Sequence, residues 1–305
     1  MSSSSPAVSA RDRMLALMQV TGGMISVQLG TSLAKLLFPV FGASNMLGLR
    51  TFFAAVALVL VFGTWRWHGL SVRVLRVLLP YAIALTGMNA MFYLALNRLP
   101  LGIAVAIEFI GPLTLAFLSS RRVADVLWIA LTVVGLGLLL KPQSAVTLDM
   151  VGVGYAVIGA GFWTGYIICC RKLAHKVPPG HGCAVGMAIG AVILLFPCTV
   201  PALVIGFHNP AMLALSVVVA LSSSALPYAL EMRAMHRLTT REFGLLCSLE
   251  PVCATLSGTL LLHEIPSLRQ LSGILCIVTA SAGIVLGPSR ASHEPVPSEL
   301  PKLLD

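Results

Sequence analysis

Long apolar stretches separated by short polar segments make up the hydrophobic pattern of this chain. None of them has the strict alternation of a strand in an outer-membrane barrel. Most approach the roughly 20 residues that a helix needs to cross a bilayer. The pattern predicts ten transmembrane helices, at about 15–37, 45–63, 77–96, 101–119, 124–140, 151–170, 182–206, 211–230, 243–263 and 268–287.

The composition also indicates a membrane protein. Hydrophobic residues make up 57% of the 305 residues, charged residues only 10%, and the mean hydropathy is +0.94. In a typical soluble domain about 25% of the residues are charged. A soluble chain of this size could not bury so much apolar surface. The sequence therefore predicts an all-α polytopic membrane protein.

The Lys and Arg residues are distributed unevenly between the segments that join the predicted helices. With the N-terminus inside, fifteen lie on the inner side, Lys35 lies within the first helix, and four lie on the outer side. The outer four are Arg50, Arg98, Lys141 and Arg269. By the positive-inside rule both termini are predicted to be cytoplasmic. The net charge of +9 is thus a sign of topology, and no nucleic-acid partner is expected.

The two halves of the chain contain a weak repeat. The segment "ALNRLP" (95–100) aligns with "AMHRLT" (234–239), and at the same offset Pro112 aligns with Pro251. This predicts two units of five helices, 14–140 and 151–287, between cytoplasmic disordered tails at 1–13 and 288–305. Because five is odd, the two units must have opposite orientations, an architecture typical of secondary transporters. A duplication without a transport role is the alternative.

Glu108, Glu250 and Lys35 are charged residues within the predicted spans. Glu108 lies near the centre of the fourth, Glu250 about a third of the way along the ninth, and Lys35 near the end of the first. A charge at the centre of a membrane helix costs roughly 2.5–3.5 kcal/mol, so such residues mark a functional site by default. The alternatives are that the two acids are protonated and only bond neighbouring helices, and that Lys35 reaches the membrane surface.

Prolines interrupt the same spans. Pro112 removes the helical partner of the Glu108 carbonyl, Pro251 does the same for Cys247, and Pro227 interrupts the eighth span. A freed carbonyl is tolerated in a membrane only beside protein or a wet cavity. A carboxylate next to a freed backbone acceptor suits an ammonium group or a proton, so the sequence predicts a cavity wall here.

Polar residues at helical spacing extend this predicted cavity. They form one narrow stripe on each of three spans: Gln28, Ser32 and Lys35; Thr86, Asn89 and Tyr93; and Ser224, Tyr228 and Glu231. Ordinary hydrogen bonding between helices is the alternative reading of any one of them. The candidates for substrate or proton binding are Glu108, Lys35, Gln28, Asn89, Tyr93, Tyr228 and Glu250.

Cysteines and glycines are interpreted as packing residues. The seven cysteines contain no CxxC pair, so neither a disulfide nor a metal site is expected. Glycines recur at four-residue spacing in the spans 151–170, 182–206 and 268–287, which predicts close helix packing or a homodimer contact.

These residues give the chain a family resemblance. Five segments carry it in order: "SLAKLLFPVFGA" (32–43), "PLGIAVAIEFIGPL" (100–113), "SSRR" (119–122), "SSALPYALEM" (223–232) and "SLEP" (248–251). With them the chain resembles the drug/metabolite transporter superfamily built from two EamA units, and more narrowly the bacterial threonine/homoserine exporters of the Rht type. A departure lies at Thr239 and Glu242, where those exporters tend to have a proline and a neutral residue, and we expect it to affect gating or topology.

The resemblance implies ten helices in an inverted five-plus-five arrangement and export of small neutral amino acids across the inner membrane. For such a zwitterion, Glu108 is the candidate partner of the ammonium group. Lys35 or the backbone N–H groups of a kinked helix are the candidates for the carboxylate. The proton gradient is the expected energy source, and no cofactor is expected, since no GxxxxGK[ST] motif is present.

Other functions stay open at this point. The cargo of such an exporter could be another amino acid, another metabolite or a drug. A passive channel is a further alternative. An intramembrane lipid enzyme would need clustered catalytic residues, and the pair His263–Glu264 has no second His nearby.

Overall fold

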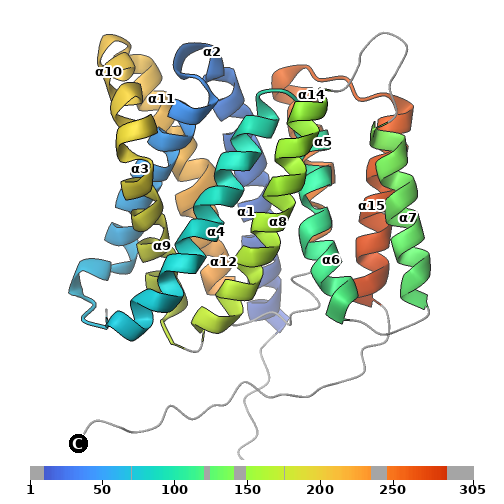
Figure 1. Cartoon of the computed structure of the whole chain (residues 1–305), viewed down its shortest axis with the longest axis horizontal. Helices are drawn as coiled ribbons and strands as arrows, with labels where there is room; N and C mark the ends of the chain where they lie inside the picture. The colour runs from blue at the N-terminus through green and yellow to red at the C-terminus, as the bar shows by residue number, and fades with distance from the viewer. Residues whose placement is uncertain are drawn as a thin grey trace, which may run out of the picture.

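The computed structural model describes residues 10–69, 71–119, 124–140, 149–174, 176–234 and 246–286, and this part of the chain is all-helical. Its long helices stand side by side in one bundle (Figure 1). The first half contains α1 (Ala10–Leu36), α2 (Phe38–Phe41), α3 (Ala43–Phe62), the short 3-10 helix η1 (Thr64–Arg66), α4 (Val72–Leu96), α5 (Leu101–Glu108), α6 (Ile110–Ser119) and α7 (Ala124–Leu140). The second half contains α8 (Met150–Ala174), α9 (Pro179–Ile193), the π-helix η2 (Leu195–Thr199), α10 (Val200–His208), α11 (Pro210–Ala220), the π-helix η3 (Leu221–Ala225), α12 (Leu226–Ala234), α14 (Glu250–Leu262) and α15 (Leu268–Leu286).

Each predicted span overlaps one of these helices or a consecutive group of them, and the ninth, 243–263, begins outside the described residues. The predicted tail at 1–13 overlaps the start of α1, which begins at Ala10. The first turn of α1, residues 10–13, consists mostly of charged residues, so apolar periodicity alone does not detect it. Three other features of the sequence lie outside the described residues: the predicted tail at 288–305, Lys141, and the departure from the related exporters at Thr239 and Glu242.

Among the described residues, four helices are long and apolar enough to cross a membrane, or five if the bent pair Gly180–Ile193 and Leu195–His208 forms one span. The outer surface of the bundle carries large apolar side chains. Phe196 is 78% exposed, Phe207 75% and Leu260 71%. So much exposed apolar surface is typical of contact with lipid, not water. The structure therefore agrees with a membrane protein.

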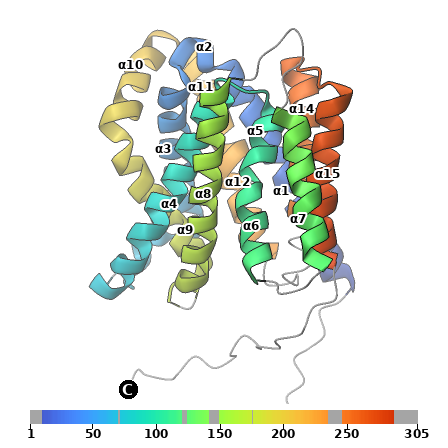
Figure 2. The ribbon, with the colours of Figure 1, turned by 45° about the vertical axis from the view of Figure 1, so that its right-hand side comes forward.

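The helices pack in pairs that join the two halves of the chain. α4 lies against α8, α1 against α12, α3 against α9, α5 against α14, and α7 against α15. The last pair forms one edge of the bundle, and α10 lies at the opposite edge (Figure 2). The interior contains large buried side chains such as Tyr93, Met46 and Leu96, together with many fully buried alanines. Small residues allow backbones to approach closely, which stabilises helix pairs where lipid supplies no hydrophobic drive.

Several of the helices are interrupted. α5 ends at Glu108 and α6 begins at Ile110, so the break lies just before Pro112. Pro227 follows the π-helix η3, and Pro251 lies in the first turn of α14. An additional bend of 62° lies between α9 and α10, where Pro197 cannot complete the α-helical ladder and η2 forms instead. No prediction from the sequence placed a bend here.

The predicted packing residues contact neighbouring helices of the same chain. A Cβ atom at Gly186 would collide with the ring of Tyr81, one at Gly190 with Thr86, and one at Gly283 with Trp128. All seven cysteines are free, and Cys183 and Cys198 are buried in the apolar core. The cysteines are therefore unpaired, and these three glycines serve helix packing within one chain.

At one end of the bundle, Asp149 begins α8 and pairs with Arg98. Its Oδ2 accepts a hydrogen bond of 2.6 Å from Arg98 Nη1, and its Oδ1 accepts bonds from the backbone N–H groups of Val151 and Gly152. The Arg98 hydrogen bond, supported by those of the two N–H groups, holds the pKa of Asp149 below its ordinary value. This is an N-cap with a charge-assisted partner.

This pair predicts a specific pH dependence of stability. Because the folded pKa is lowered, the stabilisation by the Asp149 charge is complete above the unfolded value of about 3.9 and is lost as the pH falls through the folded pKa. Asp149→Asn keeps a capping side chain but not the charge. The melting temperature of the variant in detergent should therefore lie below that of the wild type at pH 6, and the difference should shrink at pH 3. An equal difference at both pH values would contradict this assignment.

Candidate functional site

Arg50 lies at the centre of a buried polar network. It stands in the second turn of α3, is only 5% exposed, and makes three hydrogen bonds. Nε donates to Ser224 Oγ at 2.8 Å, Nη1 to Asn89 Oδ1 at 2.9 Å, and Nη2 to the carbonyl of Ser223 at 3.2 Å. Its guanidinium also lies 5.1 Å from the ring centroid of Tyr93, within the range of a cation–π contact. The network joins α3 and α4 to η3 of the other half.

The break at Pro227 supplies one acceptor of this network. Pro227 has no N–H, so the carbonyl of Ser223, four residues earlier, has no α-helical donor. Arg50 Nη2 donates to that same carbonyl. The neighbouring carbonyl of Ser222 accepts from Ser26 Oγ of α1 at 2.7 Å. The π-helix therefore presents backbone acceptors to polar side chains of the first half, a common use of π-helical turns at functional sites.

Arg50 is not among the site residues predicted from the sequence, and the prediction that it lies on the outer side is wrong. An arginine near a span end commonly reaches the membrane surface, which is why the topology rule assigned it to a loop. A signal was nevertheless present, since Arg50 lies inside the predicted span 45–63. Asn89 and Ser224, which lie on two predicted polar stripes, both accept from it.

Glu108 ends α5 in the interior of the bundle. It is 5% exposed, and its Oε1 is buried without a hydrogen-bond partner among the described residues. Its carboxyl group packs against the backbone of α8 at Gly159, where a Cβ atom would collide with Oε1. Glu250 and Arg50 are within electrostatic range. Glu108 therefore faces protein, as a costly buried acid must.

Glu250 begins α14 on the other side of the interface between the halves. Its Oε2 is also buried without a partner in the described part of the chain. The two acids differ in their position on the helices: Glu108 ends α5, at the negative end of its dipole, and Glu250 lies at the positive end of α14. The negative end of a helix attracts cations. An ammonium group or a proton would therefore find a favourable position at Glu108.

The predicted site residues Tyr93, Gln28 and Tyr228 each lie in different surroundings. Tyr93 is fully buried, and its Oη has no partner among the described residues. Gln28 on α1 is buried, and its side-chain oxygen is likewise without a described partner. Tyr228 on α12 is half-buried and packs against the apolar cluster that contains Tyr81 and Leu85. The unpaired atoms of Tyr93, Gln28, Glu108 and Glu250 are each able to bond a polar ligand or water.

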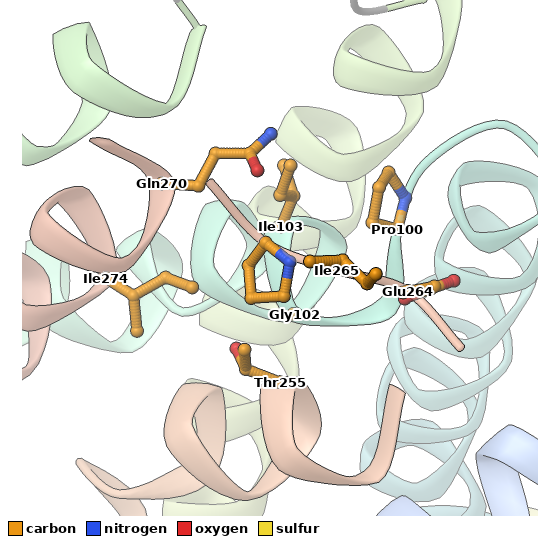
Figure 3. A pocket seen from close by; sticks show the side chains of 9 residues that line it. Pro100, Gly102, Ile103, Thr255, Glu264, Ile265, Gln270 and Ile274 are labelled. Atoms are coloured by element: carbon orange, nitrogen blue, oxygen red, sulfur yellow. The ribbon is translucent and has the colours of Figure 1, made fainter. Parts of the chain in front are cut away.

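A pocket of about 140 Å³ lies elsewhere, near the end of the bundle where α5 begins (Figure 3). It is lined by Pro100, Gly102, Ile103, Thr255, Glu264, Ile265, Pro266, Gln270 and Ile274. Its lining comes from the first turn of α5, from α14 and α15, and from the segment between these two helices. None of the predicted site residues lines it, so this pocket does not correspond to the predicted chamber.

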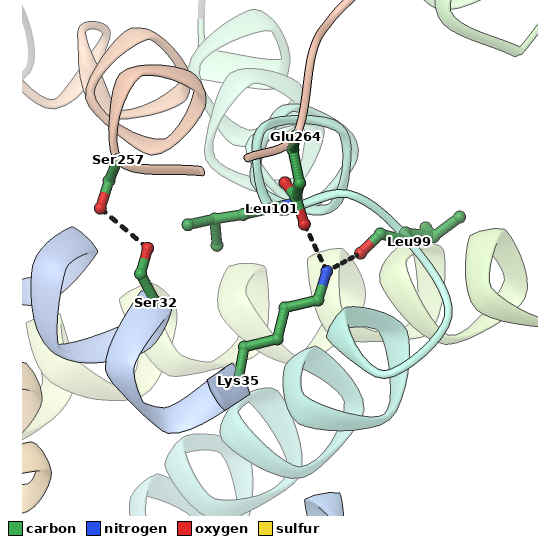
Figure 4. Close-up of polar contacts among 6 residues, drawn as sticks. All are labelled: Ser32, Lys35, Leu99, Leu101, Ser257 and Glu264. Atoms are coloured by element: carbon green, nitrogen blue, oxygen red, sulfur yellow. Dashed lines mark hydrogen bonds and ion pairs between the residues drawn. The ribbon is translucent and has the colours of Figure 1, made fainter. Parts of the chain in front are cut away.

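Lys35 belongs to a separate network beside this pocket (Figure 4). Its Nζ donates to Glu264 Oε1 at 2.6 Å and to the carbonyl of Leu99 at 2.7 Å. Glu264 Oε2 accepts from the backbone N–H of Leu101, which begins α5. Leu101 and Glu108 lie seven residues apart on one helix, a rise of about 10 Å. Lys35 therefore pairs with Glu264 and not with Glu108, and Glu264 caps α5.

We predict a measurable coupling between Lys35 and Glu264. Their side chains are 21% and 20% exposed, so removing the charge of Lys35 should lower stability by about 1–2 kcal/mol. Lys35→Met and Glu264→Gln should each lower the melting temperature in detergent. Because they remove the same ion pair, the double variant should melt close to the less stable single variant. Strictly additive losses would contradict a coupled pair.

Three comparisons place the chain among known proteins. The model of the EamA-like transporter family matches residues 150–286. The threonine/homoserine exporter RhtA of Salmonella typhimurium strain LT2 is 40% identical over 264 residues, which cover 86% of this chain and 88% of that protein. The exporter RhtA of Escherichia coli strain K12 is 39% identical over 266 residues, with the same coverage. One crystal structure, 16% identical, superposes with a TM-score of 0.57 over 91% of this chain and 97% of that chain, which supports the fold alone.

These relatives are transporters and not enzymes, which removes the intramembrane lipid enzyme from the alternatives. The identity exceeds the level at which family membership is secure, and it extends over most of both chains. The chain is therefore a multi-pass membrane transporter and belongs to the EamA-like family of the drug/metabolite transporter superfamily.

Proposed function

We propose that this protein is a secondary exporter of small neutral amino acids of the threonine/homoserine type, driven by proton antiport across the bacterial inner membrane. The observation that carries the proposal is the pair of buried acids, Glu108 and Glu250. Each has a carboxyl oxygen without a described partner at a helix break, and they lie within electrostatic range of each other. An acid in this position can alternate between a proton and the ammonium group of a substrate.

The proposed architecture is two inverted repeats of five transmembrane helices, with both termini cytoplasmic. The contact pattern supports it, because α4 packs against α8 just as α1 packs against α12. The pairs α3–α9, α5–α14 and α7–α15 each join elements that are equivalent in the proposed repeat. A twofold axis that relates the two halves would make α4–α8 the counterpart of α1–α12. The same axis would place the equivalent helices of the other three pairs beside each other. The family model, which matches residues 150–286, covers nearly the whole proposed second repeat.

The orientation follows from the distribution of charge. The start of α1 and the end of α15 lie at the same end of the bundle (Figure 1). With Arg50 inside the bundle, only Arg98, Lys141 and Arg269 are left on the proposed outer side. The excess of basic residues on the opposite side is then larger than the sequence analysis assumed, and it assigns that side to the cytoplasm.

Alternating access requires contacts between the halves that can break and form again. Arg50 to Ser224, Ser26 to Ser222, and Ser32 to Ser257 are such contacts, because each crosses from the first half to the second. They are hydrogen bonds that water or substrate can replace as the halves move. In the proposed cycle, substrate leaves Glu108 on the outer side, and a proton takes its place for the return.

Transport into proteoliposomes tests this function. In vesicles with an interior one pH unit more acidic than the medium and with the membrane potential clamped, labelled threonine should accumulate about tenfold in a one-to-one exchange. A protonophore should abolish the accumulation. Flux that only equalises the concentrations and does not respond to the pH gradient would favour a channel. Competition by unlabelled homoserine, other amino acids, purines and cationic drugs defines the cargo.

A further inference from the structure

The charge of Arg50 has no contacting counter-ion among the described residues. The three side chains or carbonyls that accept from it are all neutral, and the two ion pairs described elsewhere involve Lys35 and Arg98. Glu108 is within electrostatic range but does not bond it. Burial of a cation without a contacting anion is costly. A network that only joined helices would not need this charge, because a neutral amide could donate to the same acceptors.

The guanidinium also retains donors. It carries five N–H groups, of which the described bonds use one on Nε and one on each terminal nitrogen. One N–H on each terminal nitrogen is therefore left, which is the number that a carboxylate accepts in a bidentate arrangement. Ser224 and Asn89 hold the guanidinium from two different helices. It is thus fixed before any ligand arrives.

The unpaired acceptors near Arg50 complete the recognition of a zwitterion. Glu108 Oε1 and Glu250 Oε2 are buried and can accept from an ammonium group. Tyr93, whose ring lies under the guanidinium, has a buried and unpaired Oη that can bond a substrate hydroxyl. One fixed cation and one unpaired acid within electrostatic range of it, Glu108, match the charges of an α-amino acid.

We propose that Arg50 binds the carboxylate of the exported amino acid and so restricts transport to substrates that carry a free carboxylate. This inference rests on the proposed function and deepens it. It assigns to Arg50 the role that the sequence analysis gave to Lys35, which is bonded to Glu264 and Leu99. The Arg50 bonds to Ser223 and Ser224 of the other half then connect carboxylate binding to the contact between the halves.

Binding of two ligands to the purified full-length protein tests the proposal. L-Threonine and L-threoninol differ only in that the second has a hydroxymethyl group in place of the carboxylate. The wild type should bind threonine at least about tenfold more tightly than threoninol. Arg50→Gln should weaken threonine binding to about the affinity of threoninol and leave threoninol within about twofold of its wild-type affinity. A purely structural role would weaken both ligands equally, and that result, or an unchanged preference, would overturn the proposal.

Two further variants keep the test decisive. If Arg50→Gln does not fold, Arg50→Lys is the variant to measure, because lysine keeps the charge but lacks the planar guanidinium. Its preference for threonine over threoninol should fall but not vanish. An equal loss of affinity for both ligands would overturn the proposal. Ser224→Ala removes one support of the guanidinium, so the preference for threonine should fall but not vanish, and an equal loss for both ligands would indicate a purely structural network. Wild-type protein that binds neither threonine nor homoserine would contradict the proposed function, and this inference with it.

Discussion

We expect Glu108→Gln to abolish proton-driven accumulation of substrate while the variant still folds and reaches the membrane. Glutamine has nearly the same shape and can occupy the site against Gly159, but it neither carries a proton nor pairs with an ammonium group. In vesicles with a pH difference of one unit, the accumulation of threonine should fall from about tenfold to about onefold. The residual flux should no longer depend on pH.

Two controls separate this effect from a general loss of acidic side chains. Asp149→Asn removes an exposed acid far along the chain from the predicted site and should accumulate threonine like the wild type. Glu250→Gln reports on the second buried acid, and a loss of coupling there as well would show that the two acids work together. Wild-type accumulation and unchanged pH dependence in Glu108→Gln would remove Glu108 from the mechanism.

Gly159→Ala should have the second large effect, through the position of the same carboxyl group. A Cβ atom at Gly159 would collide with Glu108 Oε1 and lie 3.1 Å from its Cδ and 3.2 Å from its Cγ. The Glu108 side chain must therefore shift, because the backbone of α8 is fixed by its packing against α4, α5 and α6. Displacing a functional group by about 1 Å can lower a rate by about a hundredfold. We expect the initial rate of export to fall by about tenfold or more.

Gly161→Ala is the matched control for this prediction. It makes the same substitution two residues along α8, at a position where an added Cβ meets nothing within 4 Å. Its export rate should equal that of the wild type, and the better helix propensity of alanine should not lower its stability. Equal export by Gly159→Ala and Gly161→Ala would show that the fit between Glu108 and α8 has no role in transport.

Much of the fold follows from local sequence. Apolar segments of sufficient length predict helices wherever they occur, because the backbone in a membrane must satisfy its own hydrogen bonds. The locations of Pro112, Pro227 and Pro251 indicate where these helices are interrupted, since proline lacks a donor whatever surrounds it. The family resemblance was read from five segments in order along the chain, and the comparisons confirm the family. These features need no knowledge of which helix lies beside which.

The partners of the charged side chains, in contrast, required the three-dimensional structure. Lys35 and Glu264 are far apart in sequence, and only the packing of α1 beside α14 brings them to 2.6 Å. Likewise, Arg50 near the start of its span could reach either the membrane surface or the interior. Its side chain lies in the interior because it bonds the acceptors Asn89, Ser223 and Ser224 on two other helices.

The sequence by itself determined that this protein is a helical membrane protein, which segments are apolar, and where its backbone is broken. These properties depend on the free energy of transfer of each segment and on the chemistry of single residues. The tertiary structure decided which buried charges meet, that Arg50 belongs to the interior, and that η2 bends the chain at Pro197. Such properties depend on contacts between helices that are distant in sequence, and no local pattern specifies them.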